Sequence, residues 1–287
     1  MHWLLPTAHP GGSRHVPVAR ISAVAAVAVG TFLVLRTQSG PHWRTLGPGV
    51  EFATLRGEPY CRRGSAEIAA LRLDPSHARL RIMHYSLIDA PKPLNIVEWQ
   101  HQTGALAVFN AGQFYPDWSY MGLLVCSGHA ISTDVHPAFK AALVASPIHG
   151  APAIRVLDLD RQALDPRLPG WREVAQSFML FDRDGNVRVR RTDRVANRTV
   201  VLEDRHGRVV VLTTEGGYTL ADLAEWTRRA PLAAAQAMAM DGGYEAEMCV
   251  RTSEFRYASF GRWDGSGDGA APGAHALLPA VVAVESE

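Results

Sequence analysis

The chain has 287 residues, of which 47% are hydrophobic and 20% charged, and its formal net charge at pH 7 is +1. This composition provides enough apolar material for one large globular domain and a short appendage. Because the charges balance, no strongly charged partner is implied. A nucleic-acid ligand would require a clustered basic stripe. The one candidate cluster is interpreted as the solvated face of a hairpin, so no nucleic-acid partner is predicted: Arg183, Arg188, Arg190, Arg191 and Arg194.

The N-terminal residues are predicted to lie outside the globular fold. Residues 1–20 form a basic tail, and residues 21–35 are almost entirely apolar. A helix over this run would be roughly 22 Å long, which is short for a bilayer core of roughly 30 Å. A signal-peptide core and a membrane anchor both fit the pattern. Because no clean cleavage site follows Leu35, we expect an uncleaved anchor with an extracytoplasmic domain; secretion after cleavage is the alternative.

The following residues predict one α+β domain. Residues 36–49 read as a linker, and the domain is expected to span residues 50–287. Apolar alternation with period two and short apolar runs predict strands, at 50–55, 67–73, 79–85, 105–110, 121–126, 153–157 and 174–181. A helix is expected over 94–102, ended by Gly104. The strands outnumber the helices, so we expect mixed, mostly antiparallel sheets with a few packed helices.

The C-terminal half continues as a meander. Turns at 184–186 and 204–207 predict hairpins between strands rich in valine and arginine. Thr219, with Asp222 three residues later, resembles a capping box that opens a helix ending at Arg229. The next element runs into Met240, a long flexible loop is expected over 261–273, and an apolar strand over 276–284 closes the chain.

A polar turn follows the strand predicted at 105–110. Asn110, Gln113, Asp117 and Ser119 are interleaved there with aromatic residues, namely Phe114, Tyr115, Trp118 and Tyr120. Aromatic faces combined with amides and acids suit a sugar ring, which has apolar faces and a rim of hydroxyl groups. The alternative is an ordinary loop rich in aromatic residues.

A second turn combines an acid with two glycines. Asp241 follows an apolar run, and Gly242 and Gly243 follow Asp241. Glycines permit backbone conformations closed to other residues, so the turn can hold Asp241 at the end of a buried element, facing a cleft. The carboxylate would then be a catalytic group, or it would cap a tight turn.

These segments together resemble the phosphodiester glycosidase family. The matching motifs occur in the family's order between about residue 105 and residue 245, at 110–115 with 122–123, 174–180, 197–199, 219–224 and 240–243. Two departures stand out. Phe178 replaces a Gly-Pro pair, and Tyr244, Glu245 and Ala246 replace small and hydroxyl residues.

The resemblance implies roles for particular residues. Asp241 would be the carboxylate that stabilises or attacks the anomeric carbon, with Asp117 or Glu245 as the second carboxylate. Arg198 would bind the phosphate through its guanidinium fork. The turn and strand residues would contact the substrate, namely Asn110, Gly112, Gln176, Gly242 and Gly243. In the alternative, both residues are structural: Arg198 pairs with Asp193 or Glu203, and Gln176 is a buried amide whose hydrogen bonds are all made within the fold.

Neither a cofactor nor a metal is expected. The histidines show no metal-ligand spacing, and the three cysteines, Cys61, Cys126 and Cys249, include no Cys-x-x-Cys pair. If the strands that carry Cys126 and Cys249 are neighbours, those two are the better candidates for a disulfide. Three free thiols are the alternative.

The sequence therefore predicts an extracytoplasmic hydrolase, a glycosidase that cleaves the sugar–phosphate bond of glycan phosphodiesters in the cell envelope. Its partners would be a glycan or sugar-phosphate substrate and, through residues 21–35, a membrane. A non-catalytic glycan-binding domain derived from the same family is the alternative, favoured by the Tyr244-Glu245-Ala246 replacement. We also expect Asn110, Gln176, Arg198 and Asp241 to converge on one cleft.

Overall fold

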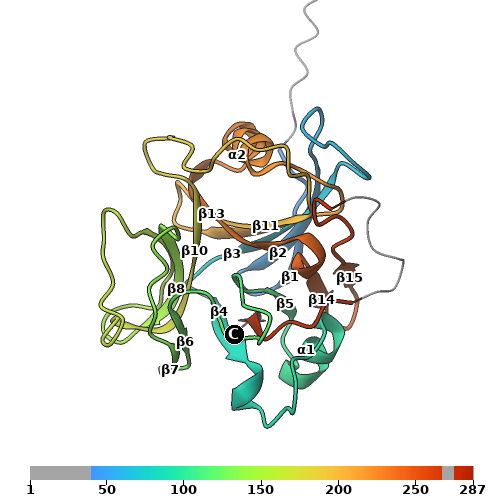
Figure 1. The fold of residues 1–287 in the computed structure, drawn as a ribbon. Helices are drawn as coiled ribbons and strands as arrows, with labels where there is room; N and C mark the ends of the chain where they lie inside the picture. Colours follow the sequence, from blue (N-terminus) through green and yellow to red (C-terminus); the bar gives the residue numbers. More distant parts are fainter. Residues whose placement is uncertain (1–39, 267–274, 287) are drawn as a thin grey trace, which may run out of the picture. The chain divides into compact units, whose positions relative to one another are not determined.

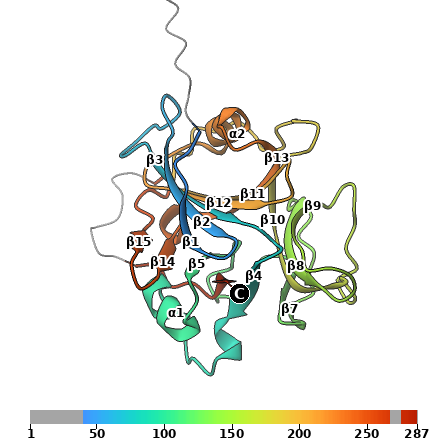
Figure 2. The same cartoon turned by 180° about the vertical axis from the view of Figure 1, so that it is seen from behind.

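The computed structural model describes residues 40–266 and 275–286, and in this part of the chain two β-sheets are accompanied by two α-helices (Figures 1 and 2). The expected basic tail and anchor, residues 1–35, lie outside the described residues. Within residues 40–266 and 275–286, neither helix is long and apolar enough to cross a membrane. Every strand pair described is antiparallel, which confirms the mostly antiparallel sheets expected from the sequence.

The larger sheet has 11 strands in the order β1-β2-β3-β12-β11-β13-β10-β6-β7, and β8 and β9 branch from it through β10. Its strands are β1 (Arg44–Gly47), β2 (Val50–Arg56), β3 (Glu67–Leu73), β6 (Leu124–Cys126), β7 (His129–Ser132), β8 (Ala141–Pro147), β9 (Ile154–Asp158), β10 (Trp171–Phe181), β11 (Arg198–Asp204), β12 (Val209–Thr214) and β13 (Ala234–Gly242).

The smaller sheet has five strands in the order β15-β14-β5-β16-β4. They are β4 (Ala78–His84), β5 (Ala107–Asn110), β14 (Met248–Arg251), β15 (Arg256–Ser259) and β16 (Ala280–Ser286). Two short 3₁₀ turns, Tyr85–Leu87 and Gly243–Glu245, follow β4 and β13. The chain thus passes repeatedly from one sheet to the other, and this brings strand ends from both sheets together.

The two sheets pack face to face, and a helix covers the outer face of each (Figure 1). Successive side chains of a strand point to opposite faces. In β11, Val201 therefore joins the core between the sheets, whereas Val200 and Leu202 pack under α2 (Leu220–Arg229). Helix α1 (Ile96–Thr103) packs in the same way against the smaller sheet, with Trp99 fully buried.

Both predicted helices form, and their ends follow the capping rules. Asn95 Oδ1 accepts hydrogen bonds from the amides of Val97 and Glu98, each at 3.0 Å. The helix then ends at Gly104, whose φ of 62° is left-handed. At α2 only half of the expected capping box is present. Thr219 accepts from the Asp222 amide, while the Asp222 carboxylate pairs with Arg62.

Two sequence predictions differ from the structure, and for the cysteines the structure agrees with the alternative of free thiols. The expected linker contains β1, which pairs with β2 in the larger sheet. The turn at 184–186 leads to a single bridge between Phe181 and Val187 and not to a second strand. The reason is local, because Arg188 folds onto Asp160 and Asp182 as ion pairs and does not extend along a strand. The cysteines are free, and Cys126 and Cys249 lie in different sheets.

Candidate active site

Three of the sequence-predicted residues meet where strands from the two sheets end. Asn110 ends β5, Arg198 opens β11 and Asp241 lies one residue before the end of β13. The Asn110 amide donates to the carbonyl of Asp241 at 3.0 Å, and the Asp241 N–H donates to the carbonyl of Ala111 at 3.1 Å. Arg198 lies opposite Gly242 in the pairing of β11 with β13. The three residues thus form one cluster, which we call the strand-end site.

The Asp241 carboxylate is held in an environment that disfavours its charge. Its Oδ1 accepts one hydrogen bond, from the Gly242 amide at 2.8 Å. Burial, with a smaller contribution from the nearby Glu245 carboxylate, raises its pKa to about 7 against the opposing effects of Gly242, Arg194 and Arg198. A carboxyl group with such a pKa exists in both protonation states near neutral pH. This is a property expected of a group that exchanges protons or charge with a substrate.

The two glycines after Asp241 are required by close packing and by backbone conformation. A Cβ atom on Gly242 would lie 2.9 Å from the carbonyl oxygen of Asn197 and 3.0 Å from Arg198 Nη1. Gly243 has φ +86°, which disfavours other residues. Together they bring the backbone after Asp241 directly against the guanidinium of Arg198.

The Arg198 guanidinium is oriented by backbone carbonyls. Its Nε donates to the carbonyl of Tyr218 at 3.1 Å and its Nη2 to the carbonyl of Arg194 at 2.9 Å. No ion pair joins it to a carboxylate within residues 40–266 and 275–286. Burial, with a smaller effect of Arg194, lowers its pKa to about 10, so it remains a cation at neutral pH. A partly buried cation that forms no ion pair with a carboxylate is suited to receive a phosphate.

Neither Glu203 nor Asp193, the two carboxylates expected as internal partners of Arg198, pairs with it. Glu203 forms ion pairs with Arg155, at 3.0 Å, and with Arg183. Asp193 lies in the exposed segment before β11 and forms no hydrogen bond or ion pair with Arg198. The geometry therefore favours an external ligand over an internal ion pair.

Glu245 is the second acid of this cluster. It lies in the 3₁₀ turn that follows β13, so it does not share a strand face with Glu247. Burial raises the pKa of Glu245, and the Asp264 carboxylate raises it further, while Arg194 opposes the shift. Two acids of raised pKa, Asp241 and Glu245, thus lie within electrostatic reach of each other.

Sequence reasoning missed three residues that complete the site. Arg194 was grouped with a basic surface, but its Nε donates to the Asp264 carbonyl at 3.0 Å, and its charge acts on Asp241 and Glu245. Asn197 is fully buried, and its Oδ1 accepts from the amides of Arg262 and Trp263, each at 2.8 Å. The Asn-Arg-Thr motif marked Asn197, but no local pattern pointed to Asp264.

Asn110 has no hydrogen-bonding capacity left for a substrate. Its Oδ1 accepts from Thr199 Oγ1 at 2.7 Å and from the Glu247 amide at 3.3 Å. Its Nδ2 donates to the carbonyls of Ala111 and Asp241, each at 3.0 Å. Because an amide side chain has two acceptor and two donor positions, all four are filled. Asn110 therefore positions the backbone of Asp241.

Gln176 is satisfied in the same way, and its side chain is directed elsewhere. Its Oε1 accepts from the amides of Leu123 and His136, each at 3.0 Å. Its Nε2 donates to the carbonyls of His136, at 3.1 Å, and Phe139, at 2.8 Å. These partners lie directly before β6 and in the loop before β8. Gln176 is thus a core amide, and the structure does not bring its side chain to Asp241.

Asp117 and Gly112 shape the loop after β5. The exposed Asp117 carboxylate accepts from the Ser119 amide at 3.1 Å and from Ser119 Oγ at 2.7 Å, and these bonds hold its pKa below the usual range. It therefore acts as a turn cap. Gly112 makes room for Tyr120, whose hydroxyl would lie 2.3 Å from a Cβ atom at that position.

One further buried acid lies behind the site. Glu247 is fully buried, and its Oε2 has no hydrogen-bond partner within the described part of the chain. Burial raises its pKa to about 8, with a smaller contribution from the charge of Glu245. Its backbone amide donates to Asn110, so it is linked to Asp241 through that side chain. Among residues 40–266 and 275–286, no group of three His, Cys, Asp or Glu side chains could hold a metal ion.

Comparison with known proteins identifies a family and a fold. A family model described as phosphodiester glycosidase matches residues 103–278, which contain every residue of the strand-end site. The catalytic domain of zebrafish N-acetylglucosamine-1-phosphodiester alpha-N-acetylglucosaminidase, solved in a form auto-inhibited by its pro-peptide, is similar with a TM-score of 0.54 and 13% identity. The alignment covers 86% of this chain and 87% of that chain.

A hypothetical protein from Synechocystis is similar with a TM-score of 0.58 and 10% identity, over 87% of this chain and 64% of that chain. At such identities the two structures establish a shared fold only. No curated protein sequence matches the chain.

Proposed function

The chain belongs to the phosphodiester glycosidase family, and from that premise we propose that it hydrolyses the bond between a sugar and a phosphate in glycosyl-1-phosphodiesters of extracytoplasmic glycans. One observation carries the proposal. Arg198 is a partly buried cation without a carboxylate partner in the described residues, and it lies beside Asp241, a carboxyl group whose pKa is raised to about 7. A substrate that places a phosphate next to an anomeric carbon fits these two groups.

Arg198 would act on the leaving group. When the bond from the anomeric carbon to the phosphate oxygen breaks, the electron pair stays on that oxygen and the phosphate gains negative charge. A phosphate is already a good leaving group, so it requires a nearby cation more than a proton. Arg198 is held by two backbone carbonyls before substrate arrives, so little reorganisation is required at the moment of reaction.

Asp241 would act at the sugar. The transition state resembles an oxocarbenium ion, and a carboxylate stabilises that positive charge. The same group can accept the proton of an attacking water or attack the anomeric carbon itself. Each of these roles requires the ionised form, which is populated above a pH of about 7. The overall products are a free reducing sugar and a phosphate monoester.

Glu245 is assigned as the second carboxylate of the pair, because its charge contributes to the raised pKa of Asp241. Asp117 is not assigned a role in the reaction, since it caps its own exposed loop. The extracytoplasmic location and the membrane anchor in this proposal depend on the apolar residues 21–35 alone.

The test is to incubate the purified full-length chain with an aryl glycosyl-1-phosphodiester in water enriched in ¹⁸O. We expect free sugar and aryl phosphate, with no ¹⁸O in the aryl phosphate, because cleavage at the anomeric carbon adds the oxygen of water to the sugar. Release of phenol and sugar phosphate would show that a phosphorus–oxygen bond is broken, which contradicts the proposal. Saturable binding of the substrate with no product would instead favour a glycan-binding domain.

A further inference from the structure

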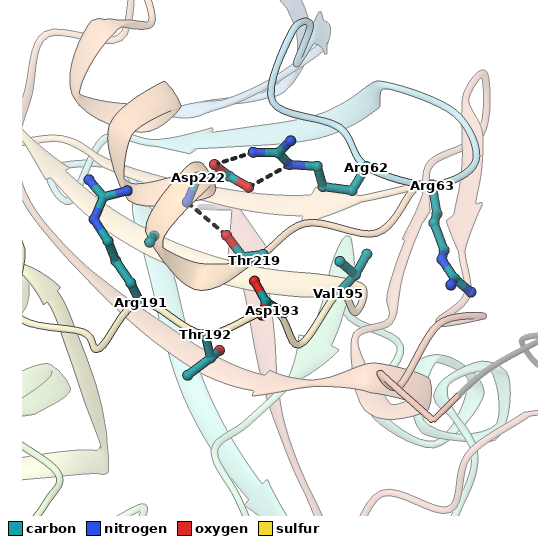
Figure 3. Close-up of a pocket in the computed structure, with 9 residues that line it drawn as sticks. Arg62, Arg63, Arg191, Thr192, Asp193, Val195, Thr219 and Asp222 are labelled. Carbon is teal, nitrogen blue, oxygen red and sulfur yellow. Dashed lines mark hydrogen bonds and ion pairs between the residues drawn. The ribbon is translucent and has the colours of Figure 1, made fainter.

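A second charged region lies beside α2, on the other side of the chain segment that leads to Arg198. It is a hollow of about 540 Å³. Six of its lining residues matter here, namely Arg62, Arg63, Arg191, Asp193, Val195 and Asp222 (Figure 3). We call it the arginine pocket. Its volume lies within the range of roughly 300–1,000 Å³ that is usual for small-molecule sites.

The arginine pocket and the strand-end site share one wall. Residues Ala196 and Tyr218 form an antiparallel bridge, so the chain before β11 is extended there. In extended chain, alternate side chains point to opposite sides. Asp193 and Val195 accordingly line the pocket, whereas Arg194 reaches Asp264 at the strand-end site. A ligand in the pocket would therefore be separated from Arg198 by a single layer of backbone.

The charge of the pocket is only partly compensated. Arg62 and Asp222 form a two-pronged ion pair, with Nε–Oδ2 at 2.8 Å and Nη2–Oδ1 at 3.0 Å. Arg191 approaches Asp222 from the other side in Figure 3, yet it has no hydrogen bond or ion pair within the described residues. Beside the Arg62–Asp222 pair, Arg191 therefore keeps its guanidinium donors available for an anion.

We propose that the arginine pocket binds a second phosphate group of the same glycan substrate. A guanidinium presents paired donors that match phosphate oxygens, which favours this anion over a single carboxylate. The pocket is larger than a phosphate alone requires, so part of the attached sugar would enter with it. This inference depends on the proposed function for the nature of the glycan, while the binding of a sugar phosphate to the pocket is independent of any turnover.

The experiment is isothermal titration of the full-length chain with two probes, glucose 1-phosphate and inorganic phosphate. The variants are Arg191→Ala and, as a matched control, Arg190→Ala. Arg190 is the exposed neighbour and does not line the pocket. We expect glucose 1-phosphate to bind about tenfold more weakly to Arg191→Ala, a difference of about 1.4 kcal/mol. Binding to Arg190→Ala should be unchanged, and circular dichroism should show both variants folded.

The following results would overturn the proposal. The first is equal weakening in the two variants, which would indicate diffuse attraction. The second is a failure of the unaltered chain to bind glucose 1-phosphate, or equally tight binding of inorganic phosphate, which would remove the sugar from the site. The third is binding that is lost in Arg198→Lys and kept in Arg191→Ala, because the anion would then occupy the strand-end site. A chain that binds as expected but hydrolyses no phosphodiester would contradict the proposed function and leave the pocket in place.

Discussion

Arg62 in the arginine pocket is held by a two-pronged ion pair with Asp222, whereas Arg198 at the strand-end site is held by backbone carbonyls alone. The aspartates beside these two arginines, Asp222 and Asp241, also differ in their pKa. Arg62 holds the pKa of Asp222 below its usual range, while burial raises that of Asp241 to about 7. In the pocket, opposite charges stabilise each other in the folded chain. At the strand ends, both signs of charge are partly buried and not paired with each other.

This difference carries a cost and an implication. Removing a charge from water without a close partner destabilises a fold, so such charges are rare unless function requires them. Three acids of raised pKa lie at the strand-end site or directly behind it, namely Asp241, Glu245 and Glu247. We infer that these groups are kept for a ligand, whereas the Arg62–Asp222 pair is explained by the stability of the fold.

The sharpest test of this contrast is Asp241→Asn with Asp117→Asn as its matched control. Asn keeps the size of Asp241 and its hydrogen bond from Gly242 but removes the charge that the transition state requires. We expect sugar release to fall by about three orders of magnitude, the middle of the range for a catalytic acid or base. Asp117→Asn should retain activity within about twofold, since asparagine also caps such turns.

The melting temperatures of the same two variants give a second test of this contrast. When an acid has a higher pKa in the folded state than in the unfolded state, the folded protein loses stability as the pH rises from the unfolded pKa to the folded pKa. Asp241→Asn should therefore melt at a higher temperature than the unaltered chain at pH 8, and Asp117→Asn should not. If Asp241→Asn hydrolyses substrate at the unaltered rate, Asp241 is only a turn cap.

The next largest effect is expected for Arg198→Lys, compared with Arg205→Lys. A lysine cannot donate to Tyr218, to Arg194 and to a phosphate with the fixed geometry of a guanidinium. We expect kcat/KM to fall roughly 100-fold, as when one preorganised donor to a developing anion is removed. Arg205 is exposed in the turn between β11 and β12, so its change should have no effect. Equal activity of the two variants would exclude a phosphate-binding role for Arg198.

Gln176→Leu separates a structural amide from a ligand. The change leaves the amides of Leu123 and His136 and the carbonyls of His136 and Phe139 without partners. We expect the free energy of unfolding to fall by roughly 2–5 kcal/mol. The protein that remains folded should keep its kcat and KM, and Gln162→Leu, at an exposed glutamine, should change neither quantity. A raised KM at unchanged stability would instead make Gln176 a substrate ligand.

The successes of the sequence analysis come from local signals. Alternation of apolar residues located most of the strands, and the residues that cap and end a helix located α1 and α2. The turn after β13 was predicted from Asp241, Gly242 and Gly243, because glycines mark such turns wherever the rest of the chain lies. These features depend on neighbours a few residues apart.

What the sequence could not predict depends on distant partners. Asn110 is satisfied by partners far away in the sequence, namely Thr199 in β11, Asp241 in β13 and Glu247 just before β14. Likewise, Asp264 enters the site only because the chain after β15 returns to Asn197. Family motifs can mark such residues as important. Whether an amide side chain is free to bind a ligand or is used up by hydrogen bonds within the fold depends on its full set of partners.

The finest test concerns the interaction between the two acids of the strand-end site. Because Asp241 must be ionised and its pKa is about 7, kcat/KM should rise with pH through a midpoint near that value. The charge of Glu245 raises that pKa, since a second negative charge nearby disfavours ionisation of the first. Glu245→Gln should therefore shift the midpoint to lower pH, and Glu254→Gln, at an exposed acid, should leave it in place. Were Asp241 instead a proton donor, activity would fall through the same midpoint, and Glu245→Gln would move that falling limb to lower pH. The direction of the limb thus distinguishes the two roles, and its displacement tests whether Glu245 and Asp241 act as a pair.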